Sequence, residues 1–145
     1  MERVIFSAKK KRRERRMRKE WIICIVVIFI VLVANIITQN YTKDSVEYMD
    51  KKLEALKETL LKEEVEKEKV QEEMDDVMKD WKKRYEKLAY FIEHDELEKV
   101  ETELTSLKAN IRVEQYEDGV PDLDKSIFIL DHIKEKFKLN IKNIF

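Results

Sequence analysis

The chain has 145 residues, of which 42% are charged, and its formal net charge is only −1. One glycine and one proline leave few turns, which argues against a sheet fold and favours an all-helical one. A single cysteine excludes an intramolecular disulfide, and the length allows one folded domain besides a membrane span.

The small net charge conceals a division between the start of the chain and the rest. Residues 1–20 carry ten basic and three acidic side chains, a net charge of +7, whereas the remaining residues carry −8. Most of the basic side chains form one cluster directly before an apolar run: Lys9, Lys10, Lys11, Arg12, Arg13, Arg15, Arg16, Arg18 and Lys19.

The apolar run from Trp21 to Ile37 predicts a transmembrane helix over residues 21–38. Its 17 residues carry no charge. At about 1.5 Å of rise per residue they are just long enough to cross a bilayer. A cleaved signal peptide fits less well, because the run is long for one. The candidate residue before the cleavage site is Ala34, and Leu32 then occupies the −3 position, where a small residue is needed.

The flanks of this run predict its orientation. The segment that follows it, residues 38–44, has Lys43 as its only basic residue. By the positive-inside rule, residues 1–20 form a cytoplasmic tail and residues 39–145 an extracytoplasmic domain of a single-pass protein of the cell membrane. We expect the tail to contact the bilayer and its anionic headgroups rather than nucleic acid, since no aromatic residues alternate with the basic ones.

Apolar residues after the run recur at spacings of three and four, which predicts amphipathic helices. We call the row of apolar residues along one face of a helix its seam. Asp44 or Ser45 could cap the helix with the first seam, and the pattern is interrupted at residues 62–69 before the second seam begins. The chain either turns there to form a hairpin or continues as one helical rod. The seams comprise Val46, Met49, Leu53, Leu56 and Leu60, and then Val70, Met74, Val77, Trp81, Tyr85, Leu88 and Ile92.

Two further helices are predicted beyond His94. Asp95 and Glu98 have the spacing of a capping box at the start of the third helix. Gly119 is placed to end that helix with a positive φ, and Pro121 to begin the last one. The seams are Leu97, Val100, Leu104, Leu107 and Ile111, and then Leu123, Ile127, Leu130, Ile133 or Lys134, and Phe137.

No one of these helices can bury its seam alone, so the fold class is all-α, with an antiparallel three- or four-helix bundle after the transmembrane helix. In a four-helix bundle the turn near His94 and the end of the chain lie on the membrane-proximal side. Ile141, Ile144 and Phe145 are therefore interface candidates toward lipid or a partner membrane protein. The alternative is that this tail folds back onto its own bundle.

Few residues indicate chemistry. His94 and His132 lie beside carboxylates and are weak zinc candidates, although capping and surface hydrogen bonding explain them as well. We predict no catalytic residues and no cofactor. The aromatic stretch Trp81–Phe91 fits a packed core better than a ligand pocket.

The second half of the chain resembles a known family. The Trp81 region, the segment Phe91–Leu97 (FIEHDEL) and the ending Lys138–Phe145 (KLNIKNIF) carry the resemblance, which covers a little under half of the chain. The family is domain of unknown function 4363, found in small single-pass membrane proteins of endospore-forming and related Gram-positive bacteria. It implies a membrane-anchored extracytoplasmic helical domain and supplies no activity, while the long basic tail and the Tyr116–Pro121 linker depart from its pattern.

Three functions compete, none of them enzymatic. The leading hypothesis is a structural or accessory interaction module for another membrane or envelope protein. The second is a bitopic cell-division protein that pairs with its own copies through a coiled coil, which requires a continuous helix from Asp44 to Ile92. The third is an external ligand-sensing domain that acts through a partner, because about 20 cytoplasmic residues leave no room for an output domain.

Overall fold

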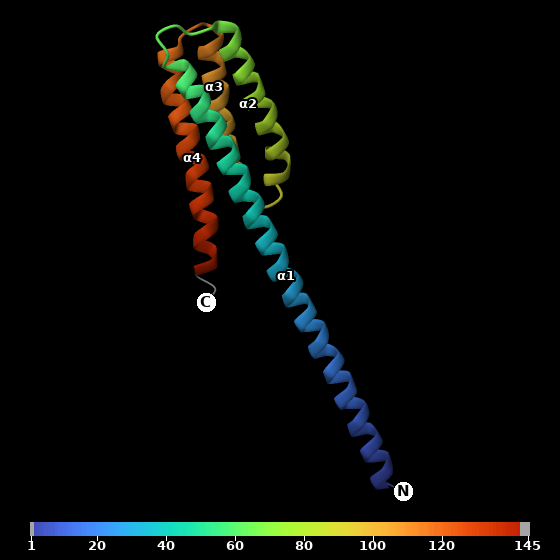
Figure 1. The fold of residues 1–145 in the computed structure, drawn as a ribbon. Helices are drawn as coiled ribbons and strands as arrows, with labels where there is room; N and C mark the ends of the chain where they lie inside the picture. The colour runs from blue at the N-terminus through green and yellow to red at the C-terminus, as the bar shows by residue number, and fades with distance from the viewer. Residues whose placement is uncertain (1, 143–145) are drawn as a thin grey trace. The chain divides into compact units, whose positions relative to one another are not determined.

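A computed structural model describes the backbone of residues 2–142 and the side chains of residues 17–137. The described chain is all-helical (Figure 1). Its internal contacts divide it into two units, Met1–Thr38 and Gln39–Phe145. The elements are α1 (Glu2–Leu60), α2 (Lys67–Leu88), α3 (His94–Arg112) and α4 (Tyr116–Lys142).

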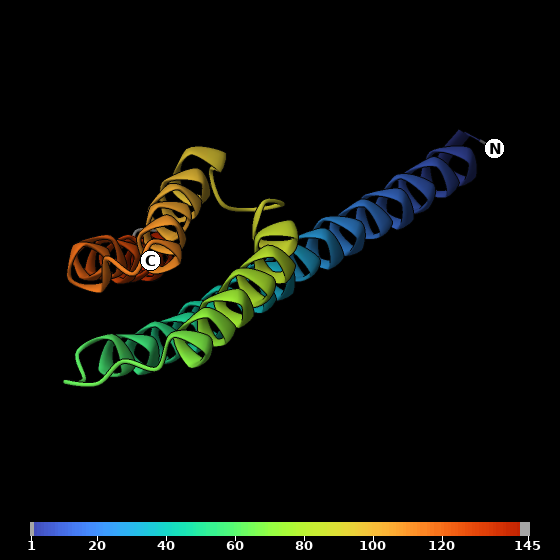
Figure 2. The same ribbon diagram turned by 90° about the horizontal axis from the view of Figure 1, so that it is seen from above.

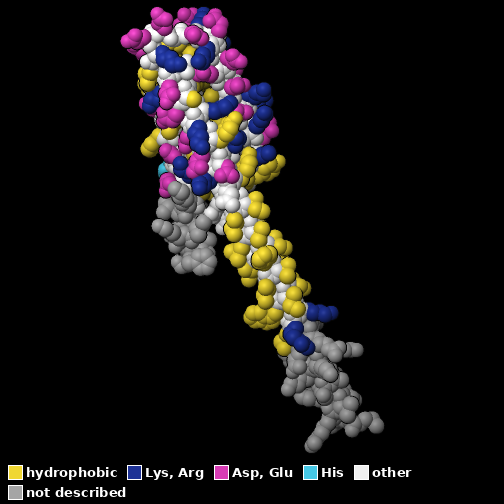
Figure 3. Space-filling model, viewed as in Figure 1, with side chains coloured by type: hydrophobic (Ala, Val, Ile, Leu, Met, Phe, Trp, Pro, Cys, Tyr) yellow, Lys and Arg dark blue, Asp and Glu magenta, His cyan; other side chains and the backbone are white. Residues whose placement is uncertain are grey.

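The described residues of the first unit all belong to α1 and include the apolar run. This helix is long and apolar enough to cross a membrane, and none of its most apolar window is buried within the chain. Trp21 is 71% exposed and Phe29 65%. Figure 3 shows the hydrophobic side chains of this stretch as a continuous surface without charges, the opposite of the charged surface of the bundle.

The second unit is an antiparallel bundle of four helices, to which α1 contributes its part after Thr38. Ion pairs join each helix to two neighbours, so the helices form a closed ring. Figure 2 shows α1 beside α2 and α3 beside α4. The pairs are Lys52–Asp80 between α1 and α2, Lys108–Asp75 between α3 and α2, Lys125–Glu103 between α4 and α3, and Lys57–Asp124 between α1 and α4.

The core of the bundle consists of the predicted seams. Seventeen of the residues predicted to lie on the inner faces are at most 2% exposed, and Trp81 is the largest of them; Leu60 and Ile92 are 5% and 6% exposed. Tyr85, Ile127 and Phe137 are half-buried at its margin. The burial of one apolar face per helix, with charged residues on the outer faces, is what holds four helices of this composition together.

The interruption after the first seam is a turn, so the hairpin alternative is correct and the continuous rod is not. α1 ends at Leu60 and α2 begins at Lys67. Between them the side chains from Leu61 to Glu64 are exposed, and only Val65 is half-buried. A helix continued through this charged segment would bury no apolar face, whereas the turn lets the second seam pack against the first.

Asp44 and Ser45 do not cap a helix, because α1 is already helical on both sides of them. Ser45 is buried instead, and its Oγ accepts a hydrogen bond from Arg84 of α2 at 3.2 Å. The prediction of a cap was wrong because the apolar run and the first seam lie in one continuous helix. No helix begins at Asp44 or Ser45, so no free N–H groups are there to be capped.

The predicted capping box at Asp95 is also absent. α3 begins at His94, its N-cap is Glu93, and no side chain there bonds the free N–H groups. Asp95 and Glu96 lie within the first turn. Their negative charges still favour the helix start, because the N-terminal end of the helix dipole is positive.

Gly119 does not end a helix. The residue with positive φ is Glu114, at φ 62°, in the turn between α3 and α4. Gly119 lies inside α4, where an added Cβ would come within 3.0 Å of Leu107 Cδ1. The glycine therefore serves a close approach of α4 to α3. Pro121 follows within α4, which begins earlier than predicted, at Tyr116.

Candidate functional site

One end of the bundle is rich in aromatic side chains; we refer to Tyr41, Tyr90, Phe91 and Phe137 as the aromatic end. The Phe91 ring contacts Tyr41 and Phe137 edge to face, with centroids 6.2 and 6.5 Å apart. These contacts bring together α1, the α2–α3 turn and the last part of α4. Tyr90 lies in the turn and is 88% exposed. The Lys87 ammonium lies 5.7 Å from the Tyr41 ring centroid.

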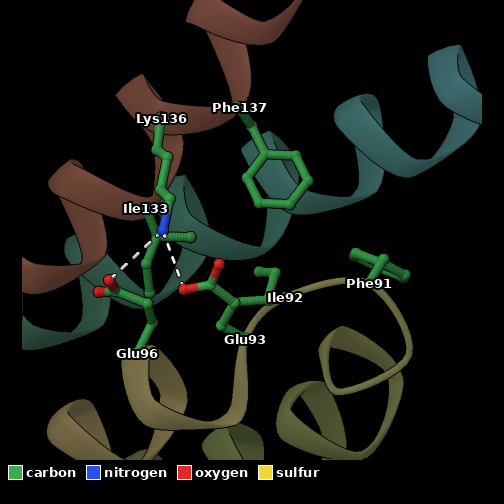
Figure 4. A pocket seen from close by; sticks show the side chains of 7 residues that line it. All are labelled: Phe91, Ile92, Glu93, Glu96, Ile133, Lys136 and Phe137. Atoms are coloured by element: carbon green, nitrogen blue, oxygen red, sulfur yellow. Dashed lines mark hydrogen bonds and ion pairs between the residues drawn. The ribbon is translucent and has the colours of Figure 1, made fainter.

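A small pocket of about 110 Å³ opens at this end (Figure 4). Lys136 reaches from α4 toward the start of α3, where its Nζ lies 3.1 Å from Glu93 and 3.6 Å from Glu96. The hydrogen bond to Glu93 raises the pKa of Lys136. The pocket holds no more than a few water molecules, and its one ammonium group is paired with both of its carboxylates, so its geometry serves to tie α4 to the α2–α3 turn and the start of α3.

A larger groove of about 640 Å³ runs along α2 and reaches α3 at Glu101. Trp81 and Tyr85 line it with their rings edge to face, 5.9 Å apart, and charged residues of α2 flank them. Within the described residues, the buried Trp81 Nε1–H has no acceptor. The groove thus offers aromatic contact area flanked by charged side chains.

A polar network joins α1 to α2. The Tyr48 hydroxyl donates a 2.7 Å hydrogen bond to Asp80, and the Arg84 guanidinium stacks over the Tyr48 ring at 3.9 Å. Hydrogen bonds from Lys52 and Tyr48 lower the pKa of Asp80, which therefore stays charged. This network fixes the register of the two helices.

A third polar cluster lies between α1 and α4. Asp50 faces Lys134, whose Nζ is 3.9 Å from Asp50 and 2.7 Å from Asp131. Among the described side chains none donates to the buried Oδ1 of Asp50. Desolvation, with repulsion from Asp131 and less from Glu47 and Glu54, raises the pKa of Asp50 to about 6 despite the attraction of Lys134.

The predicted site residues are dispersed. His94 and His132 are both exposed, and in the described part of the chain no three His, Cys, Asp or Glu side chains gather as metal ligands. Arg18 and Lys19 of the basic cluster are exposed. Seven predicted orientation residues lie outside the described side chains: Lys9, Lys10, Lys11, Arg12, Arg13, Arg15 and Arg16.

The predicted interface candidates at the end of the chain also lie outside the described residues. Ile141 falls within α4 by its backbone, but its side chain is not described, and Ile144 and Phe145 are not described at all. The prediction that this tail is a contact surface therefore stays a prediction. Sequence reasoning missed the exposure of Tyr90, which it grouped with Trp81 as core.

Of the comparisons with known proteins, the one with family models finds a match, and it covers the bundle. The family model described as a domain of unknown function (DUF4363) matches residues 36–144, which extends the resemblance from the second half of the chain to the whole bundle. No curated protein and no solved structure matches the chain. A match over this share of the sequence shows that the chain belongs to the DUF4363 family.

Proposed function

We propose that the protein is an extracytoplasmic interaction module held at the cell membrane by one helix. Residues 1–20 lie in the cytoplasm, residues 21–38 cross the bilayer, and the bundle of residues 39–145 serves as a structural or accessory subunit of another membrane or envelope protein. Its work is binding rather than catalysis, and it uses no cofactor.

The observation that carries the anchor is the exposure of the apolar run on every side of its helix. A buried core helix would have an apolar face covered by its own chain, but none of this window is covered. Side chains such as Ile25 at 60% and Ile37 at 63% exposed are stable only in lipid or against another apolar surface. The basic residues before the run then favour a cytoplasmic N-terminus.

The groove along α2 supports the interaction role. Its volume of about 640 Å³ is in the range of sites that hold another molecule's side chains or a small ligand. Trp81 and Tyr85 add aromatic lining that a bound segment could contact. The cell-division hypothesis loses its premise, because the helix from Asp44 to Ile92 that it needs is interrupted between Leu60 and Lys67.

The orientation can be tested with single cysteines. In a Cys24→Ala background, we expect Val113→Cys to react with a membrane-impermeant maleimide in intact protoplasts, since Val113 is exposed in the α3–α4 turn. Ser7→Cys should react only after the membrane is opened. The reverse pattern of labelling would place the bundle in the cytoplasm and overturn the proposal.

The interaction role can be tested by photocrosslinking in cells. A photoreactive amino acid at Lys82, beside the groove, should give a discrete crosslink to one membrane or envelope protein, identified by mass spectrometry. The same residue at Lys51, exposed on α1, is the matched control, and Phe145 tests the tail. Equal, diffuse crosslinking from all three positions would argue against a partner, and crosslinks to a second copy would indicate a homo-oligomer.

A further inference from the structure

We propose that the aromatic end of the bundle is a lipid-contacting surface, with Tyr90 seated among the headgroups of the outer leaflet. The inference rests on the proposed membrane anchor and adds a second contact between the chain and the bilayer. The partner is a lipid surface, recognised by an amphipathic aromatic ring rather than by charge.

The length of chain between the apolar run and the bundle limits where the aromatic end can lie. Tyr41 follows Ile37 by four residues. Four residues reach at most about 14 Å even when fully extended, and less in a helix. If Ile37 lies at the edge of the hydrocarbon core, Tyr41 lies in or just beyond the headgroup layer, whatever direction the chain takes.

The contacts of Tyr41 place the α2–α3 turn at a similar distance from the hydrocarbon core. Its ring packs against Phe91, and the ring of Phe91 packs against Phe137. Tyr90 is the next residue to Phe91 and is the most exposed large hydrophobic residue among those described. A turn at this depth therefore presents an almost uncovered tyrosine to the interface, where tyrosine is enriched in membrane proteins.

The charges at this end favour aromatic contact over electrostatic attraction. Lys136 is occupied by Glu93 and Glu96, and Lys87 lies over the Tyr41 ring. The exposed Glu86 and Asp95 add further negative charge. Among the described side chains, this surface has no excess of positive charge for anionic lipids, so the contact should form on zwitterionic phosphatidylcholine and vary little with salt.

The opposite end of the bundle provides a matched control. There an ion pair between Lys67 and Glu114 joins the start of α2 to the α3–α4 turn. Val113 is 61% exposed in the second of these turns. Tyr41 and Leu60 are 19 residues apart on α1, so the two ends are separated by roughly 28 Å at 1.5 Å per residue.

The test measures the depth of spin labels on the full chain in phosphatidylcholine vesicles, by electron paramagnetic resonance with oxygen and a nickel chelate as relaxants. In a Cys24→Ala background, labels are placed at Ile30→Cys, His94→Cys and Val113→Cys. We expect position 30 to lie in the hydrocarbon core, position 94 in the headgroup layer, and position 113 in water. Exchanging Tyr90 for Ser should return position 94 toward the aqueous value, and Tyr90→Trp should not.

The outcomes separate this inference from the anchor on which it rests. A deep label at position 30 with equally aqueous labels at 94 and 113 overturns the lipid contact alone. An aqueous label at position 30 overturns the anchor, and the lipid contact with it. A headgroup depth at position 94 that requires phosphatidylglycerol, or that survives Tyr90→Ser, overturns the role given to the tyrosine.

Discussion

Replacing Leu104 by Asp is expected to unfold the bundle. Leu104 is fully buried at the middle of α3. The change removes a core side chain and places a carboxylate without a partner in its position, a combination that costs about 4–5 kcal/mol or more. Because domains of this size are stable by only about 5–15 kcal/mol, the change removes roughly a third of that stability or more, and at the low end of the range it leaves the bundle unfolded.

Trp81 provides the measurement, since it is buried in the same core. In a Trp21→Phe background it is the only tryptophan, and its emission in detergent-solubilised full-length protein should shift to longer wavelength in the Leu104→Asp variant. Thr105→Asp is the matched control, because Thr105 is the adjacent residue on the exposed face. If the helices did not share a core, both variants would keep the emission of the natural chain. Equal effects of Leu104→Asp and Thr105→Asp would therefore contradict the core described above.

The inner faces of the helices could be predicted from the sequence because they depend on periodicity alone. Val46, Leu53 and Leu104 recur at helical spacing among charged residues, and all three are fully buried. A bundle of three or four helices followed from the same pattern, since each apolar helix face needs apolar neighbours, and the structure has four. The alternative of a continuous rod could not be decided beforehand, because no glycine or proline marks the turn after Leu60.

The helix ends could not be predicted, because local signals compete there with tertiary packing. Gly119 has the residue type of a helix C-cap but is needed where α4 approaches Leu107. Glu114, a residue type that rarely adopts positive φ, takes that conformation in the turn instead. In this turn Glu114 also forms an ion pair with Lys67 at the start of α2.

The candidate sites were predictable only in part for the same reason. The periodicity that identified Trp81 as core also covers Tyr85, but α2 ends at Leu88, so grouping Tyr90 with the core aromatic residues was wrong. Asp50 follows Met49 of the first seam and reads as an ordinary surface residue. Its environment depends on which face of α4 lies opposite, and that is known only from the packing of Lys134 and Asp131.

Asp50 is the group whose ionisation should weaken the bundle at neutral pH. Its pKa rises from an ordinary 3.8 to about 6 in the folded chain, mainly because of desolvation. Below pH 3.8 the carboxyl is protonated in both states and costs nothing. As the pH rises toward 6, the unfolded chain releases the proton and the folded chain keeps it, so stability falls; above that pH the loss is constant.

The variant Asp50→Asn should therefore be more stable than the natural chain, and increasingly so as the pH rises from 4 to 7. A shift of this size corresponds to roughly 3 kcal/mol, and we expect about 1–2 kcal/mol, because water screens a carboxylate that is not fully buried. Chemical unfolding of both proteins at several pH values, followed by Trp81 emission, gives the difference directly and cancels the other titrating groups. Asp75→Asn, which removes an exposed carboxylate paired with Lys108, should change stability little at any pH. A gain for Asp50→Asn that is independent of pH, or a loss at pH 7, would mean that Lys134 already compensates the Asp50 charge.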